Sequence, residues 1–155
     1  MLRELQVILN KNIDAMYVAG ENMVTGMGVI KDFADSNVDL PAAEKATNIF
    51  FVNYDPIIIG NAAIYEMSDY DDFYNKIASG ERIKLVQPLA GERYATDQYT
   101  STGLENGNAM SVGTDGKWKK ATAQLASHFV YSGTMPDNGH TLAIIEVVDD
   151  TVTNS

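Results

Sequence analysis

Short apolar runs separated by turn-forming residues dominate the pattern of this chain. Runs rich in β-branched and aromatic residues cover 23–33, 47–54, 81–87, 109–112, 117–121, 125–132 and 141–148. Glycine, asparagine and aspartate recur between these runs, as in Asn106-Gly107 and Asp115-Gly116. Turn signals at such short intervals are typical of strands rather than long helices. The pattern therefore predicts an all-β domain, a small β-barrel or β-sandwich of about seven to nine strands.

Two hairpins are predicted from neighbouring runs. The first joins 109–112 to 117–119 through a turn containing Asp115-Gly116, and it should bring Val112 and Trp118 together. The second joins 127–132 to 141–147 through 133–140, which we expect to form a long exposed tip. Along 141–147, the residues that point to one side of a strand and those that point to the other are both mostly apolar. This favours a central strand with two buried faces.

One segment breaks the strand pattern and predicts a short helix near residues 69–79. Ser68 can cap its first turn, and Asp71 lies where the helix dipole favours an anion. Phe73 and Ile77 are four residues apart and share a face, and Gly80 suits the position after the last turn. A second helix over 40–46 is left open, because a strand run follows it closely.

The chain ends differ in character from the central part. We expect residues 1–12 to form an N-terminal arm, residues 13–150 a single β-rich domain, and the polar residues 151–155 a frayed tail. The arm carries an isolated apolar run at Leu5 and 7–9. We therefore expect that the arm orders as an added strand on a neighbouring molecule.

Composition narrows the classes of function. The 155 residues include no cysteine, which excludes disulfides, thiolate zinc sites and a cysteine nucleophile. Eleven Lys and Arg against 21 Asp and Glu give a formal charge of −10, so we expect no binding to nucleic acid or to anionic membranes. We find neither a signal peptide nor an apolar stretch long enough to span a bilayer.

The residues with catalytic chemistry form no convincing constellation. His128 and His140 could face one another across the last hairpin with Asp137 as a third metal ligand, but the spacing is not diagnostic. Ser127 precedes His128 directly, so the two side chains point to opposite faces of a strand and cannot act as a pair. We therefore predict no catalytic residues, no metal ligands and no cofactor.

Tyrosines are the remaining compositional feature. Eight are present, and five of them could form an adhesive, partly wet contact surface. These five are Tyr65, Tyr70, Tyr74, Tyr94 and Tyr99.

Several glycine-rich motifs together resemble small structural proteins of tailed bacteriophage virions. They are GERYATDQY at 91–99, GNAMSVGTDGKWKKA at 107–121, FVYSG at 129–133, NGHTLAIIE at 138–146 and VTGMGVIKD at 24–32. Within that group, the chain is most similar to capsid decoration, or cement, proteins. The resemblance extends over the stretch from residue 24 to residue 146, well over half of the chain.

The resemblance implies a non-enzymatic protein with no catalytic residues to transfer. It implies binding to the outer surface of an assembled capsid, where the protein would stabilise contacts between major capsid subunits of the same virion. A homotrimer is one arrangement that it allows. Location would be the virion surface, after folding in the host cytoplasm. The alternatives are a tail or baseplate component, and a carbohydrate-binding β-sandwich that stacks sugars on Trp118.

Overall fold

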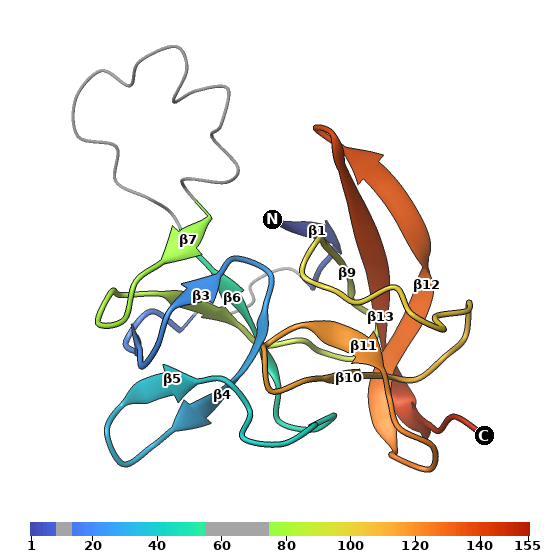
Figure 1. Ribbon diagram of the computed structural model, residues 1–155, viewed down its shortest axis with the longest axis horizontal. Helices are drawn as coiled ribbons and strands as arrows, with labels where there is room; N and C mark the ends of the chain where they lie inside the picture. The colour runs from blue at the N-terminus through green and yellow to red at the C-terminus, as the bar shows by residue number, and fades with distance from the viewer. Residues whose placement is uncertain (9–13, 55–74) are drawn as a thin grey trace.

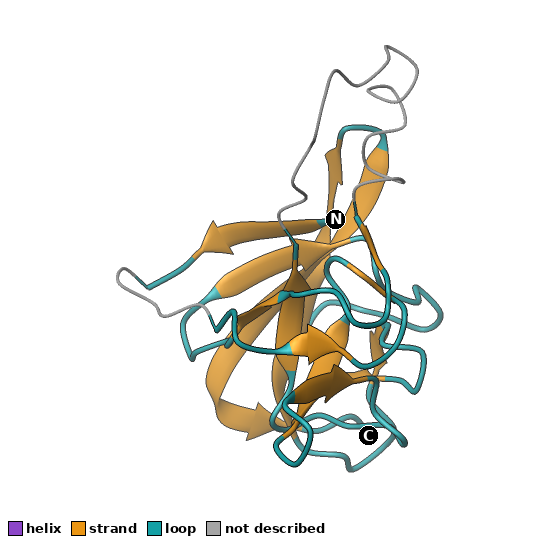
Figure 2. Ribbon diagram, turned by 90° about the vertical axis from the view of Figure 1, so that its left-hand side faces the viewer, coloured by secondary structure: helices purple, strands orange, loops and turns teal. Residues whose placement is uncertain are grey.

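The structure is a computed structural model that describes residues 1–8, 14–54 and 75–155. These residues form strands and connecting loops, and none of them is helical (Figures 1 and 2). The all-β prediction is thereby confirmed. The strands are β1 (Leu2–Gln6), β2 (Val18–Ala19), β3 (Met23–Val24), β4 (Gly28–Asp32), β5 (Asn37–Asp39), β6 (Phe50–Asn53), β7 (Lys76–Ile77), β8 (Lys84–Val86), β9 (Arg93–Thr96), β10 (Met110–Val112), β11 (Trp118–Lys120), β12 (Ser127–Asp137) and β13 (His140–Val152).

Two larger sheets and two strand pairs make up the described fold. One sheet has the order β1-β9-β13-β12 and the other β2-β5-β4-β6-β8, with β10-β11 and β3-β7 as separate pairs. No sheet closes on itself among the described residues, so of the two predicted architectures the fold is sandwich-like. In Figure 1 the five-stranded sheet fills the left half, and β9 to β13 fill the right half.

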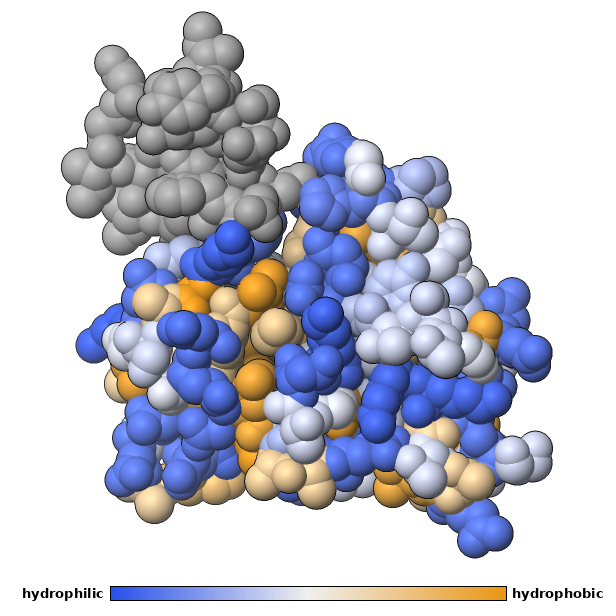
Figure 3. Space-filling model, in the orientation of Figure 1, coloured by the Kyte–Doolittle hydropathy of each residue, from blue (hydrophilic) through white to orange (hydrophobic). Residues whose placement is uncertain are grey.

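The two halves meet along a seam. The Gly28 amide at the start of β4 donates to the carbonyl of Gly116 in the β10–β11 turn, at 2.9 Å. Figure 3 shows a narrow apolar band between the halves, beside a largely hydrophilic surface on the right. Within the molecule, the ring of Phe51 in β6 stacks on Tyr94 in β9 and on Trp118 in β11, with centroids 4.6 and 4.7 Å apart. Such pairs contribute roughly 0.5–1.5 kcal/mol each beyond area burial.

The first predicted hairpin is confirmed. Strands β10 and β11 pair in antiparallel register, and Val112 lies directly opposite Trp118. Strand β13 is also central as predicted, between β9 and β12. Its Ile145 belongs to the aromatic core, whereas Leu142 packs on the opposite face with Met1.

The prediction of a long exposed tip in the second hairpin is wrong. Strand β12 continues to Asp137, β13 begins at His140, and only Asn138 and Gly139 form the turn. Their φ angles are 46° and 83°, which is the conformation of a type I′ turn. Asn-Gly adopts it readily because glycine has no Cβ and asparagine tolerates the left-handed region.

Both chain ends are held by their own domain. Strand β1 pairs with β9, so the described part of the 1–12 arm lies on this chain's sheet and not on a neighbour. Residues 9–12 lie outside the described residues. At the other end, β13 runs to Val152, and the buried side chain of Asn154 bonds both the amide and the carbonyl of Ala109 at 2.9 Å. The expectation of a frayed 151–155 tail is therefore wrong.

The helix expected near residues 69–79 falls mainly outside the described residues. Its described end is not helical, because Lys76–Ile77 forms β7 and pairs with β3. The Ile77 side chain is fully buried against the core of the five-stranded sheet, a contact that local helix signals do not reveal. No helix forms over 40–46 either; Lys45 instead makes a bridge with Val112.

Candidate functional site

The edge of the four-stranded sheet carries an unusual apolar surface. Strand β1 is the outer strand, and Leu5, Val7 and Ile8 at its end are exposed, together with Leu89 in the turn before β9. These are four of the six large apolar side chains that are exposed in the described part of the chain. We call the surface formed by residues 5–8, 87–92 and 147–149 the β1 face. Clustered exposed apolar groups beside an open strand edge are typical of interaction surfaces.

A buried carboxylate holds the β1 face in place. Glu92 is 1% exposed. Its carboxylate accepts hydrogen bonds from the Ile8 amide at 3.1 Å, the Leu89 amide at 2.8 Å and the Tyr94 hydroxyl at 2.5 Å. Burial and the neighbouring Glu92 carboxylate raise the pKa of Tyr94, so the tyrosine stays protonated and donates. The backbone amides of the exposed residues Ile8 and Leu89 are thus both bonded to the same buried carboxylate.

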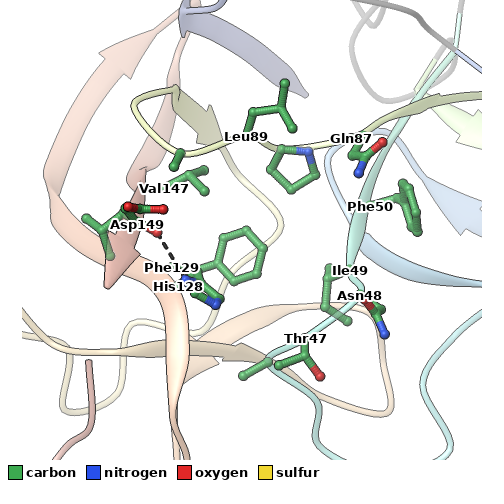
Figure 4. A pocket seen from close by; sticks show the side chains of 14 residues that line it. Thr47, Asn48, Ile49, Phe50, Gln87, Leu89, His128, Phe129, Val147 and Asp149 are labelled. Atoms are coloured by element: carbon green, nitrogen blue, oxygen red, sulfur yellow. Dashed lines mark hydrogen bonds between the residues drawn. The ribbon is translucent and has the colours of Figure 1, made fainter. Parts of the chain in front are cut away.

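A pocket of about 430 Å³ opens next to Leu89, between the two large sheets. Figure 4 shows Phe129 and Ile49 at its floor, with His128 and Asp149 on one side and Gln87 and Phe50 on the other. The first wall comes from β12 and β13, and the second from the segments around β6 and β8. A second hollow shares residues 147–149 with this pocket and reaches Gln6 of β1. The pocket and the β1 face are therefore continuous.

The polar groups at the pocket include one carboxylate, one imidazole and two side-chain amides, and they include no cationic lysine or arginine. His128 Nδ1 lies 3.1 Å from the Val148 carbonyl oxygen. A carbonyl only accepts, so Nδ1 carries a proton in this contact. The side-chain carboxylate of Asp149 and the side-chain amides of Asn48 and Gln87 have no hydrogen-bond partner among the described residues. Asn48 has a φ of 54°, a left-handed conformation that presents its side chain at the rim.

Other charged groups have structural partners. Burial alone would raise the pKa of Glu44, but hydrogen bonds from Ser111, Thr122 and Lys119 outweigh it and lower this pKa to about 2. Asp97 accepts from the Met1 ammonium at 2.6 Å and lies 3.2 Å from His140 Nδ1. These contacts tie β9 to the N-terminus and to the tip of the last hairpin.

The two histidines do not face one another across the last hairpin, the arrangement that a two-histidine metal site would have needed. His140 lies opposite Asp137 at the turn, whereas His128 contacts Val148, eight residues further along β13. That separation is about 25 Å along a strand. In the described ranges, no three His, Asp or Glu side chains are placed to share a metal ion.

Three serine hydroxyls near the last strands and the β10–β11 hairpin donate hydrogen bonds that hold the fold together. Ser127 donates to the Met110 carbonyl at 2.5 Å, Ser111 to Glu44 at 2.6 Å and Ser132 to Glu146 at 2.9 Å.

The described aromatic residues do not form the contact surface or the sugar platform that the sequence suggested. Trp118 is fully buried and its indole donates to the Gly26 carbonyl, so it offers no stacking platform for a sugar. Tyr94 is fully buried as well, and Tyr99 is partly buried and packs against the aromatic core. The other three tyrosines, at positions 65, 70 and 74, lie outside the described residues.

Sequence reasoning missed Glu92, Leu89 and the pocket. The apolar run at 5–9 was a visible signal, but its neighbours come from three other segments of the chain. No helix in the part of the chain that the structure describes has the length and apolar character to cross a membrane. No protein-family model matches the chain, and no curated protein matches it significantly.

Proposed function

We propose that this chain is a non-enzymatic structural protein of a tailed-phage virion. In this proposal it binds the outer surface of the assembled capsid through the β1 face and stabilises contacts between major capsid subunits. The observation that supports it best is the concentration of Leu5, Val7, Ile8 and Leu89 on one sheet edge. Fully burying an exposed large apolar side chain contributes roughly 1.5–3 kcal/mol, and because these four are 37–49% exposed, covering each contributes about half of that or less.

The rigidity of the face favours binding over catalysis. Because Glu92 fixes the backbone at Ile8 and Leu89, little conformational freedom is lost when a partner covers these side chains. Elsewhere, Glu44 and Asp97 serve to join segments of the fold. A preformed apolar edge of this kind suits a permanent contact with another protein.

Linkage explains how such a protein would strengthen a shell. A ligand that binds only the assembled lattice stabilises it by its own binding free energy, and the effect repeats at every site. A homotrimer at local threefold positions would add avidity without new contacts. Light scattering on the purified chain and on decorated heads would measure that stoichiometry.

Co-sedimentation with purified particles tests the proposal. We expect the protein to pellet with empty heads and not with isolated tails, and we expect the Leu5→Asp/Ile8→Asp variant to bind heads at least about tenfold more weakly. Phe33→Asp is the matched control, because Phe33 is 78% exposed and lies outside the β1 face. Binding to tails alone would support the tail or baseplate alternative instead. Equal loss in both variants would contradict a specific role of the face.

A further inference from the structure

The pocket beside the β1 face has a definite chemical preference. Its lining contains no lysine or arginine, one carboxylate at Asp149, and the imidazole of His128, whose Nε2 accepts a hydrogen bond when the ring is uncharged. On the opposite wall, the amide groups of Asn48 and Gln87 each offer a further acceptor oxygen. The floor is formed by the apolar side chains of Phe129 and Ile49 (Figure 4).

We propose that this pocket receives an arginine side chain of the protein to which the β1 face binds. The proposal rests on the proposed function for the identity of the partner and on the pocket's own chemistry for the arginine. The aliphatic stem of arginine would lie along the apolar floor, and the guanidinium would meet the acceptors at the rim.

Charge complementarity distinguishes arginine from other side chains. A guanidinium carries five N–H donors in a fixed plane and no acceptor, which matches acceptors on both walls. An acidic side chain would meet the Asp149 carboxylate and would be repelled. Lysine would satisfy Asp149 but has a compact charge that cannot span both walls as well.

The size and position of the pocket also suit an anchoring side chain. About 430 Å³ is within the usual range for ligand cavities, roughly 300–1,000 Å³. Because residues 147–149 border both the pocket and the hollow at Gln6, a segment lying along β1 could place one side chain in the pocket. Arginine is among the side chains that most often dominate protein interfaces.

Nuclear magnetic resonance titration of the full ¹⁵N-labelled chain tests the inference without a capsid. The probes are N-acetyl-arginine methylamide, its lysine analogue and its citrulline analogue, which has the same shape and no charge. We expect saturable shifts at the amides of Asn48, Gln87, His128 and Asp149 with the arginine probe. Citrulline should bind about two- to fivefold more weakly, the range that exposed ion pairs give.

Asp149→Asn and Asp150→Asn form a matched pair of variants. The two residues are neighbours on β13, both are exposed, and only Asp149 lines the pocket. We expect Asp149→Asn to weaken binding of the arginine probe about two- to fivefold and Asp150→Asn to leave it unchanged. Equal effects of both variants, or equal binding of citrulline and arginine, would overturn the proposal.

The two proposals fail separately. If the arginine probe binds at the pocket but the protein does not sediment with heads, the proposed function is wrong and the arginine site stands. If the protein binds heads while Asp149→Asn leaves the probe unaffected, the arginine site is wrong and the capsid proposal stands.

Discussion

Replacement of Glu92 by alanine should both lower the stability of the fold and make the backbone of the β1 face more mobile. The substitution removes the Glu92 carboxylate that accepts from the buried Tyr94 hydroxyl, which costs about 1–3 kcal/mol. The amides of Ile8 and Leu89 each lose a bond worth about 0.5–1.5 kcal/mol. We therefore expect Glu92→Ala to lower the free energy of unfolding by about 2–6 kcal/mol.

Urea unfolding followed by tryptophan fluorescence measures this loss. Trp118 is the only tryptophan and is fully buried beside Phe51, so its emission reports on the core. Circular dichroism supplies the second probe needed to show a two-state transition. Hydrogen exchange at the amides of Ile8 and Leu89 should become faster in the variant, in line with release of the face.

A double-mutant cycle isolates the Glu92–Tyr94 contact. Tyr94→Phe removes the donor of this hydrogen bond, so the Glu92→Ala substitution has no Tyr94 contact left to break in the double variant. We expect the double variant to lose about 1–2 kcal/mol less than the two single variants together. Additive losses, or a loss below about 0.5 kcal/mol for Glu92→Ala alone, would refute the anchoring role of this carboxylate.

Three further predictions concern the framework. Glu44→Gln should cost about 1–3 kcal/mol at pH 7. Since the folded pKa of Glu44 is lowered from 4.5 to about 2, the wild-type advantage should be present above pH 4.5 and vanish as pH falls towards 2 in acid unfolding curves. Gly26→Ala should destabilise far more than Gly139→Ala in thermal melts: both have φ near +90°, but a Cβ at Gly26 meets the Met1 carbonyl at 2.6 Å whereas Gly139 faces open space. Asn154→Ala should lower the melting temperature by several degrees, because three buried hydrogen bonds to Ala109 and Ala121 are lost; an unchanged melting curve would mean that the C-terminus is not held.

Local signals account for the parts of the fold that the sequence predicts correctly. Asp115-Gly116 marks the turn of the β10–β11 hairpin, and the doubly apolar pattern of 141–147 marks a central strand. The same kind of signal was present in Asn138-Gly139, and the error there was to treat all of 133–140 as loop. Met135 and Pro136 pair with Leu142 and Thr141 despite the missing proline amide, because a strand at the sheet edge tolerates it.

The chain ends and the candidate site depend on distant contacts that no local pattern contains. Asn154 is buried because Ala109 and Ala121, more than thirty residues away, offer it backbone partners. In the sequence, Gly91-Glu92 looks like an ordinary turn. One of the donors to the Glu92 carboxylate, however, is the amide of Ile8, which is 84 residues away in the sequence. The pocket similarly combines four segments, which is why His128 was weighed as a metal ligand and not as part of a rim of acceptors.

A cryo-electron microscopy map of heads decorated with this protein tests the central claim most directly. The account predicts that residues 5–8 and Leu89 lie against capsid subunits, and that Phe33 stays in solvent. A map in which the protein is bound but the β1 face points away from the shell would contradict it.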